Sequence, residues 1–198
     1  MSYRTELEKA IREQYLKNIE EVMKSPEDAA LQEKIDNFLL RAPLFTKNDI
    51  VEKIQTDIAF AAFFAKDPIK QNICEKFFCS YTGLSILPQG NKNSIRFTKE
   101  GTIASSKKDA YTKAVDFVYN DRYFTQKYTG ANIGGAQDNQ YKDVVDFLIY
   151  GSLYNKVGAC VDGWYWEEHG KKQELKELFR DNQNVIICSA EDIKGGLI

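Results

Sequence analysis

The pattern of apolar positions predicts an N-terminal helical region. Apolar residues recur three or four positions apart in two stretches, which is helical spacing. The first stretch contains Leu7, Ala10, Ile11, Tyr15, Ile19 and Val22, and the second contains Leu31, Ile35, Phe38 and Leu39. Between them, Ser25 and Pro26 predict a helix end and a new start, with Ser25 as the N-cap residue and Pro26 in the first turn. We therefore expect helices with a polar outer surface over residues 1–55, which either cover the core or form a subunit contact.

A further helix is predicted to begin at Asp67, the expected N-cap residue, and Pro68. Its apolar side consists of Ile69, Ile73, Phe77 and Tyr81. Glu75 lies in the middle of this helix and off the apolar stripe. From Gly83 to about residue 106 the pattern changes to turns and short extended pieces.

Extended and helical segments alternate from residue 114 onward. The strand-like runs AVDFVY (114–119) and RYFTQKYT (122–129) flank Asn120 and Asp121, a pair that favours a tight hairpin turn. A helical pattern that carries Tyr141, Val144, Val145 and Leu148 ends at Gly151. The extended runs VGACV (157–161) and NVIICSA (184–190) then alternate with the helical KKQELKELFRD (171–181). This order predicts an α/β fold over residues 56–198, with a mixed β-sheet flanked by helices on both faces.

Composition narrows the class of protein. The chain has 198 residues, of which 43% are hydrophobic and 13% aromatic, enough to bury a sizeable core in one domain. No apolar run is long enough to span a bilayer, and the charged opening segment lacks the apolar stretch of an export signal. We therefore expect a cytoplasmic protein with no membrane partner.

The cysteines and the histidine argue against two kinds of chemistry. The four cysteines form no CxxC pair and the single histidine, His169, has neither a cysteine nor a second histidine near it in sequence, so a zinc site is not expected. His169 lies in the charged run WEEHGKK, which favours a solvent-facing position over a role in a Ser-His-Asp or Cys-His hydrolase. Buried free thiols are the better interpretation of the cysteines.

A local excess of positive charge stands out against the net charge of −2. Basic residues of the segment from 89 to 113 are Lys92, Arg96, Lys99, Lys107, Lys108 and Lys113, against two acidic ones, Glu100 and Asp109. Such an excess can contact nucleic-acid phosphates on an otherwise acidic protein, although an ordinary solvated loop would look the same.

The predicted hairpin brings an acid and a lysine together. If Asn120 and Asp121 form a two-residue loop, Asp116 lies opposite Thr125 on one face of the sheet. Lys127 lies two residues beyond Thr125 and joins that face, because alternate strand residues point the same way. Phosphodiester hydrolysis with a metal needs oxygen ligands for Mg²⁺ and a cation that stabilises the developing charge. Asp116 and Lys127 supply one of each, while an ordinary cross-strand ion pair is the alternative.

The same register places Val115 and Phe117 on the opposite face, where we expect them to be buried. The two tryptophans of DGWYWEEHG, Trp164 and Trp166, could stack on bases, but aromatic residues after a sheet strand more often belong to a core or an interface.

The run VDFVYNDRYFTQKYTGANIGGAQDNQYKDVVDFL resembles the core of the PD-(D/E)XK nuclease superfamily, specifically the type II restriction endonucleases. Asp116 matches the metal-binding aspartate of the first strand, and Lys127 matches the lysine of the acid-x-Lys motif on the second. Gln137 and Tyr141 reproduce a Gln-x-x-x-Tyr pattern that some relatives carry on the following helix, and Glu75 is the candidate for an acid on an early helix. The resemblance covers roughly residues 75–190 and implies a restriction-endonuclease-like core with a Mg²⁺ cofactor.

One position departs from the family pattern, because Thr125 stands where the motif has its acid. Glu75 or Asp138 could supply the second carboxylate from a helix. Alternatively, a strand bulge could turn Gln126 inward so that its amide oxygen binds the metal. If they do not bind the metal themselves, Gln137 and Asp138 are expected to contact the metal ligands and hold them in position. In a third interpretation the site is inactive.

The resemblance implies a type II site-specific deoxyribonuclease, a restriction endonuclease that cleaves double-stranded DNA as a homodimer. In this hypothesis Asp116 binds Mg²⁺ with help from Glu75 or Gln126, Lys127 polarises the attacking water, and Lys92, Arg96, Lys107, Lys108 and Lys113 hold phosphates. A DNA methyltransferase of the same restriction-modification system would protect the host DNA. Two alternatives remain. One is a structure-specific repair nuclease, and the other is a non-catalytic DNA-binding or assembly protein on a degenerate nuclease fold. Thr125, which replaces the acid of the motif, favours the non-catalytic alternative.

Overall fold

The computed structural model describes residues 2–90, 93–130 and 135–198, with the side chains of residues 135 and 136 left aside. The chain divides into two compact units. The first comprises residues 5–77, and the second comprises residues 78–198 together with residues 2–4. None of the helices in the described part of the chain is long and apolar enough to cross a membrane.

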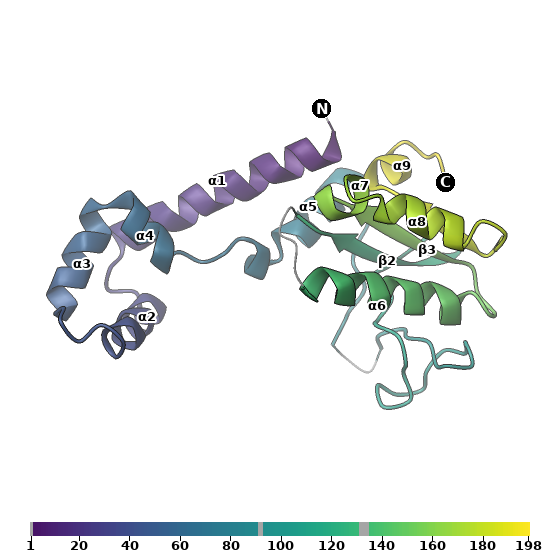
Figure 1. Cartoon of the computed structure of the whole chain (residues 1–198), viewed down its shortest axis with the longest axis horizontal. Helices are drawn as coiled ribbons and strands as arrows, with labels where there is room; N and C mark the ends of the chain where they lie inside the picture. The colour runs from purple at the N-terminus through teal and green to yellow at the C-terminus, as the bar shows by residue number, and fades with distance from the viewer. Residues whose placement is uncertain (1, 91–92, 131–134) are drawn as a thin grey trace. The chain divides into compact units, whose positions relative to one another are not determined.

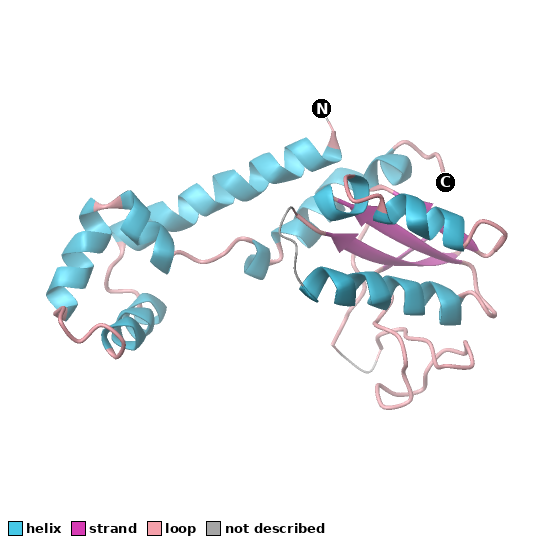
Figure 2. Ribbon diagram, viewed as in Figure 1, coloured by secondary structure: helices cyan, strands magenta, loops and turns pink. Residues whose placement is uncertain are grey.

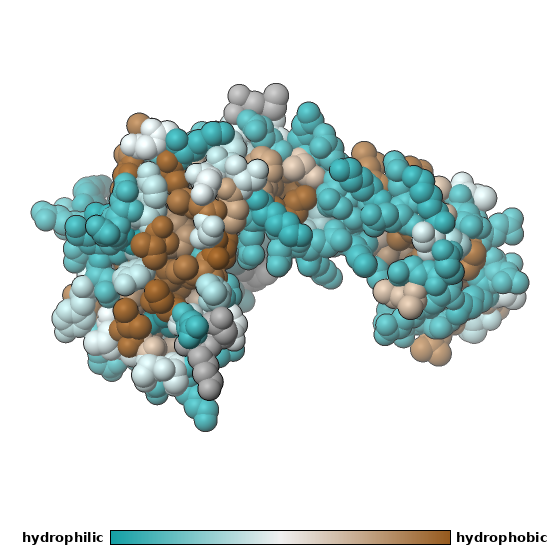
Figure 3. All heavy atoms as spheres, turned by 180° about the vertical axis from the view of Figure 1, so that it is seen from behind, coloured by the Kyte–Doolittle hydropathy of each residue, from teal (hydrophilic) through white to brown (hydrophobic). Residues whose placement is uncertain are grey.

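The first unit is built from helices around an apolar core. Its elements are α1 (Tyr3–Lys24), α2 (Ala29–Leu39), α3 (Lys47–Thr56), α4 (Ile58–Phe64), the 3₁₀ helix η1 (Ile69–Gln71) and the start of α5 (Ile73–Thr82). Apolar residues of α1 to α4 form one buried cluster, with Ile19, Leu31, Ile35, Ile50, Ile54, Ala61 and Phe64. Because α3 and α4 pack in this cluster, the compact unit extends past residue 55, where the sequence placed the end of the helical region. The outer surface of these helices is mostly hydrophilic, with scattered apolar residues (Figure 3, right).

Two predicted helix starts differ from the structure. The N-cap residue of α2 is Asp28, whose carboxylate accepts a hydrogen bond from the Leu31 amide at 3.0 Å, while Ser25 and Pro26 lie in the preceding turn region. Asp67 does accept a hydrogen bond from the Ile69 amide, but only the short η1 helix follows. Asn72, with a left-handed φ of 58°, then separates η1 from α5, because a residue in that conformation interrupts a right-handed helix.

The second unit contains a four-stranded mixed sheet, as the sequence predicts. Its strands β1 (Phe117–Tyr119), β2 (Arg122–Tyr128), β3 (Val157–Asp162) and β4 (Val185–Cys188) lie in the order β1-β2-β3-β4. The β1–β2 pair is antiparallel, and the β2–β3 and β3–β4 pairs are parallel. The connections between parallel strands run through α6 (Gly135–Gly151) and through α7 (Trp164–Glu167) with α8 (Lys171–Leu178), as parallel pairing requires (Figures 1 and 2). A short helix, α9 (Ala190–Lys194), follows β4.

Helices cover both faces of this sheet. On one face, Val157, Ala159 and Val161 of β3 pack with residues of α6, α7 and α8 in one buried cluster. On the other face, Phe117 stacks on Phe124 with ring centroids 4.8 Å apart. Phe78 of α5 contacts Phe117 on that side, and α9 packs against β3. The predicted α/β fold, with a mixed sheet between helices, is therefore confirmed.

Candidate functional site

The β1–β2 hairpin has the predicted register. Asn120 and Asp121 both have left-handed φ angles, 48° and 56°, as a two-residue type I′ turn requires. Tyr119 pairs with Arg122, and Phe117 pairs with Phe124. Asp116 immediately precedes β1 and therefore lies beside the far end of β2.

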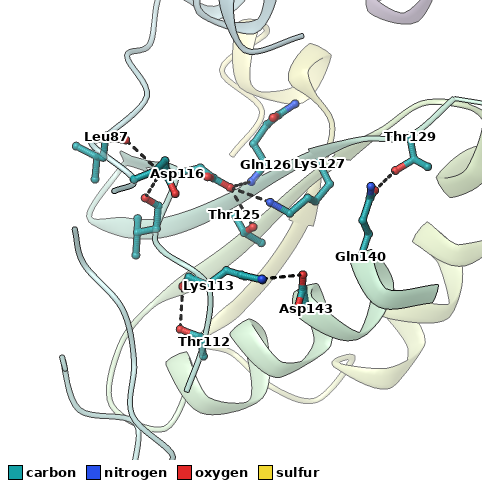
Figure 4. Close-up of polar contacts among 12 residues, drawn as sticks. Leu87, Thr112, Lys113, Asp116, Thr125, Gln126, Lys127, Thr129, Gln140 and Asp143 are labelled. Carbon is teal, nitrogen blue, oxygen red and sulfur yellow. Dashed lines mark hydrogen bonds and ion pairs between the residues drawn. The ribbon is translucent and has the colours of Figure 1, made fainter. Parts of the chain in front are cut away.

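Three donors converge on one carboxylate oxygen of Asp116. Its Oδ2 accepts hydrogen bonds from the backbone N–H of Gln126 at 2.6 Å and from the Thr125 hydroxyl at 3.1 Å. The Lys127 ammonium lies 3.4 Å from the same oxygen (Figure 4). The side chains of Asp116 and Lys127 are only 13% and 24% exposed, so this ion pair is partly shielded from water and from screening by salt. The acid and the lysine that the sequence predicted to share a surface are thus in contact.

The backbone at Asp116 is held from both sides. Its N–H donates to the Phe124 carbonyl at 2.7 Å, and its own carbonyl accepts from the Leu87 N–H at 2.7 Å. The Gln89 amide donates to the carbonyl of Val115 at 3.0 Å. The segment before the hairpin therefore fixes the aspartate in place, a support that no motif in the sequence indicated.

Alternation along β2 decides which side chains join the site. Pairing of β2 with β3 is continuous from Tyr123 to Tyr128, so the bulge that could have turned Gln126 inward is not formed. The Gln126 side chain consequently points away from Thr125 and Lys127, to the other face of the sheet (Figure 4). Its amide oxygen is therefore not placed beside Asp116, and only its backbone N–H reaches the carboxylate.

The expectation for the residues that flank Asp116 was half right. Phe117 is buried on the opposite face, against Phe124. Val115 is also buried, but it packs in the cluster that contains residues of α6. The reason is that β1 begins only at Phe117, so strict alternation does not extend back to Val115.

The other predicted ligands occupy separate environments. Glu75 is exposed on α5 and belongs to the first compact unit. Asp138, in the first turn of α6, accepts a hydrogen bond from the Tyr165 hydroxyl at 3.5 Å. The side-chain oxygen of Gln137 is buried and lacks a hydrogen-bond partner among the described residues. Within the same residues no group of three or more acidic, histidine or cysteine side chains is arranged to hold a metal ion.

Tyr141, the second residue of the Gln-x-x-x-Tyr pattern, joins α6 to α8. Its hydroxyl donates to Glu174 at 2.8 Å, and the Lys171 ammonium lies 5.0 Å from its ring centroid. Burial, together with the hydrogen bond to Glu174, raises the pKa of Tyr141 well above its ordinary value. The hydroxyl therefore stays protonated and acts as a donor between the two helices.

The basic segment contains both free and engaged side chains. Lys107 and Lys108 are exposed. Arg96 donates to the Gln89 carbonyl at 2.7 Å, and Lys113 lies 3.9 Å from the carboxylate of Asp143. Lys92 lies outside the described residues. Among the described basic residues of this segment, Lys107 and Lys108 are therefore exposed side chains that could contact phosphates.

A buried hydrogen-bond relay closes the end of β2 against α6 and α7. The Trp166 indole N–H donates to the Thr129 hydroxyl at 3.0 Å, which in turn donates to the side-chain oxygen of Gln140 at 2.6 Å. Trp166 is fully buried, so it belongs to the core and cannot stack on a base. The sequence pointed to Gln137 and Asp138 in this helix, but Gln140 carries the contact to the sheet.

We expect Trp166→Phe to lower the free energy of unfolding by about 1–2 kcal/mol, because it removes a buried donor and leaves a small void. Chemical denaturation measures the change. Trp164→Phe is the matched control, since Trp164 is partly exposed and its ring lies against His169. Equal losses for the two variants would contradict the structural role of the relay.

Asp162, the last residue of β3, is a buried acid that no motif in the sequence indicates. It is 2% exposed and accepts a hydrogen bond from the Ala190 N–H at 3.1 Å. Burial raises the pKa of Asp162 to about 7, against the opposing effect of the Lys172 charge. It also lines a cavity of about 290 Å³ with Arg4, Glu167 and other polar residues. Its only signal in the sequence is an acid directly after the apolar run VGACV.

The pKa of Asp162 predicts a pH-dependent stability. The pKa of Asp162 is higher in the folded state than in the unfolded state. The protonated side chain therefore contributes its full stabilisation below about pH 4, and this stabilisation is lost as the pH rises to about 7. Asparagine cannot ionise, so Asp162→Asn lacks this pH-dependent loss. We expect the free energy of unfolding of Asp162→Asn, minus that of the wild type, to increase by about 2 kcal/mol or more from pH 4 to pH 8. Urea denaturation at both pH values tests this, and parallel pH profiles of the two proteins would refute it.

Searches against protein-family models, curated proteins and solved structures found no match to this chain. The likeness to PD-(D/E)XK nucleases therefore stays a prediction, which rests on the residues of the hairpin and on their order along the chain.

Proposed function

We propose that the protein is a Mg²⁺-dependent endonuclease that hydrolyses phosphodiester bonds of double-stranded DNA, in the manner of a type II restriction enzyme. The observation that carries this proposal is the contact between Asp116 and Lys127, which two strands of one hairpin bring together in a partly buried setting. An acid and a lysine on such a hairpin, followed by a helix and a parallel strand, are what the resemblance implies.

The site suits a magnesium ion that is shared with the substrate. Oδ2 of Asp116 is taken by three protein donors, whereas Oδ1 has no hydrogen-bond partner among the described residues and can bind a metal. Mg²⁺ commonly binds through one or two carboxylates, with water and substrate phosphate as its remaining ligands. When bound, the ion would neutralise charge on the phosphate and lower the pKa of a bound water. Neither the exposed Glu75 nor the Gln126 amide, which is buried on the opposite face of the sheet, is needed for this arrangement.

Lys127 performs the part of the chemistry that needs a fixed positive charge. Its ammonium has three N–H donors, of which one is directed at Asp116 and the others can hold the attacking water and a phosphate oxygen. Because its side chain is mostly buried, the charge acts through less water than on an open surface. The ion pair with Asp116 keeps the ammonium in place before the substrate arrives.

Lys107 and Lys108 supply contacts to the DNA backbone away from the reacting phosphate. Contacts of this kind are independent of sequence and weaken as salt rises. Cleavage of both strands would require two active sites, which a homodimer on a symmetric target provides. A restriction enzyme of this type would act beside a DNA methyltransferase that protects the host DNA.

The first test is digestion of unmethylated phage DNA by the purified chain, in Mg²⁺ and in EDTA. We expect discrete fragments only with Mg²⁺, and none from Lys127→Ala. Lys142→Ala is the matched control, because Lys142 is an exposed lysine of α6. Cleavage confined to branched or damaged DNA would favour a repair nuclease, and DNA binding without cleavage under any condition would favour the non-catalytic alternative.

A further inference from the structure

Thr125 occupies the position at which the two functional side chains meet. We infer that Thr125 is a positioning residue whose neutral hydroxyl orients Asp116 and makes binding of the divalent cation conditional on the DNA phosphate. The inference rests on the proposed function, and it specifies how metal and substrate depend on each other at that site.

The hydroxyl is held where it can orient the carboxylate. Thr125 is 2% exposed. It pairs with Ala159 of β3, and the pairing between β2 and β3 is continuous both before and after Thr125. Its Oγ1 donates to Oδ2 of Asp116 beside the 2.6 Å bond from the Gln126 N–H. Two donors from adjacent residues of one strand fix the rotation of the carboxylate about its χ2 bond. Oδ2 is thereby engaged in hydrogen bonds within the protein, and Oδ1 is available to bind a metal.

The charge at the site follows from the same residue. The single negative charge of Asp116 is balanced by the single positive charge of Lys127, and Thr125 contributes none. A carboxylate at position 125 would change this balance to a net negative charge, opposite a like charge on Asp116. With threonine, the contacting side chains have no net attraction for a cation before a phosphate is present.

Cation and phosphate are therefore expected to bind together. Mg²⁺ gives up its water reluctantly, so a neutral site with one available carboxylate oxygen holds it weakly. A DNA phosphate adds a negative charge and further oxygen ligands. Because binding linkage is reciprocal, the cation must strengthen DNA binding by the same factor by which DNA strengthens cation binding.

The experiment uses Ca²⁺ and short fragments of unmethylated phage DNA, with the intact chain. Fluorescence anisotropy measures DNA affinity with and without Ca²⁺, and calorimetry measures Ca²⁺ binding to the protein alone. We expect Ca²⁺ to tighten DNA binding by about tenfold or more, a typical coupling, with little Ca²⁺ bound by the protein alone. Asp116→Asn should lose the gain, because its amide is no anionic ligand.

Variants of Thr125 separate the hydroxyl from the fold. Thr125→Ser should keep the Ca²⁺-dependent gain, because it keeps the donor, and Thr125→Val should lose most of it although the two side chains have nearly the same shape. Thr125→Glu should bind Ca²⁺ without DNA. Circular dichroism identifies any variant that does not fold, and the Ser and Val pair alone is sufficient for the test.

The outcomes distinguish this inference from the proposed function. Equal DNA affinity of the wild type with and without Ca²⁺ would overturn the inference and leave the nuclease proposal standing. The same gain in Thr125→Val as in the wild type would overturn the role of the hydroxyl. If the wild type binds no DNA with Ca²⁺ or without it, the proposed function itself fails.

Discussion

Asp116→Asn is expected to lower the rate of DNA cleavage at least about a thousandfold, the scale seen when one preorganised catalytic group is removed. Asparagine preserves the size of the side chain and one oxygen that can accept from Thr125 and Gln126. It removes the negative charge that pairs with Lys127 and the anionic oxygen that would bind Mg²⁺. The loss should therefore appear in the rate and not in the folding of the hairpin.

The matched control for this variant is Asp121→Asn. Asp121 is an exposed acid in the turn of the same hairpin, and its left-handed φ of 56° suits asparagine equally well. Both variants remove one negative charge from the same hairpin, so only the position of the charge differs. Initial rates on phage DNA at a fixed Mg²⁺ concentration compare them. A rate for Asp116→Asn close to that of Asp121→Asn would exclude Asp116 from the chemistry.

The second large effect concerns stability, and it arises at Gly163, directly after β3. We expect Gly163→Ala to lower the free energy of unfolding by about 3 kcal/mol or more. Gly163 has a φ of +100°, which L-residues rarely adopt, and an added Cβ would collide with the backbone oxygen of Thr129. Backbone cannot move aside as a flexible side chain can, and the same oxygen accepts a hydrogen bond from Tyr165.

Gly170→Ala separates the conformational cost from the collision. Gly170 also has a positive φ, +67°, but an added Cβ there has no atom within 4 Å. We expect it to cost about 1 kcal/mol, the price of a left-handed conformation alone. Urea denaturation measures both variants. If the two losses are equal, the close approach of Gly163 to Thr129 contributes nothing to stability.

The arrangement of the sheet could be predicted because local signals restrict it strongly. Asn120 and Asp121 can both adopt positive φ, and a two-residue loop permits one register, which places Asp116 beside Thr125 and Lys127. The helical pattern between the hairpin and VGACV supplies the crossover that parallel pairing needs, and β2 and β3 are indeed parallel. The fold class and the contact between Asp116 and Lys127 could therefore be predicted from the spacing of apolar residues and from the residues of the turn.

Other features depend on contacts between segments that lie far apart in the sequence, and the spacing of apolar residues does not reveal such contacts. The role of Thr125 as a donor depends on the orientation of the Asp116 carboxylate, and the support from Gln89 comes from a long irregular segment. Asp162 acquires its raised pKa from burial in the folded chain. For Gln126, the sequence allowed either a bulge or a regular strand, and pairing with β3 selects the regular strand.

A double-mutant cycle on Asp116 and Lys127 tests whether the two residues form one catalytic site, and it is read as the initial rate of phage DNA cleavage in Mg²⁺. The four proteins are the wild type, Asp116→Asn, Lys127→Met and the double variant. Residues that act as a unit are strongly non-additive, so we expect each single variant to lose at least about a thousandfold and the double variant to lose little more. Wild-type cleavage that survives in both single variants, or losses that multiply in the double variant, would contradict a shared catalytic site at this hairpin.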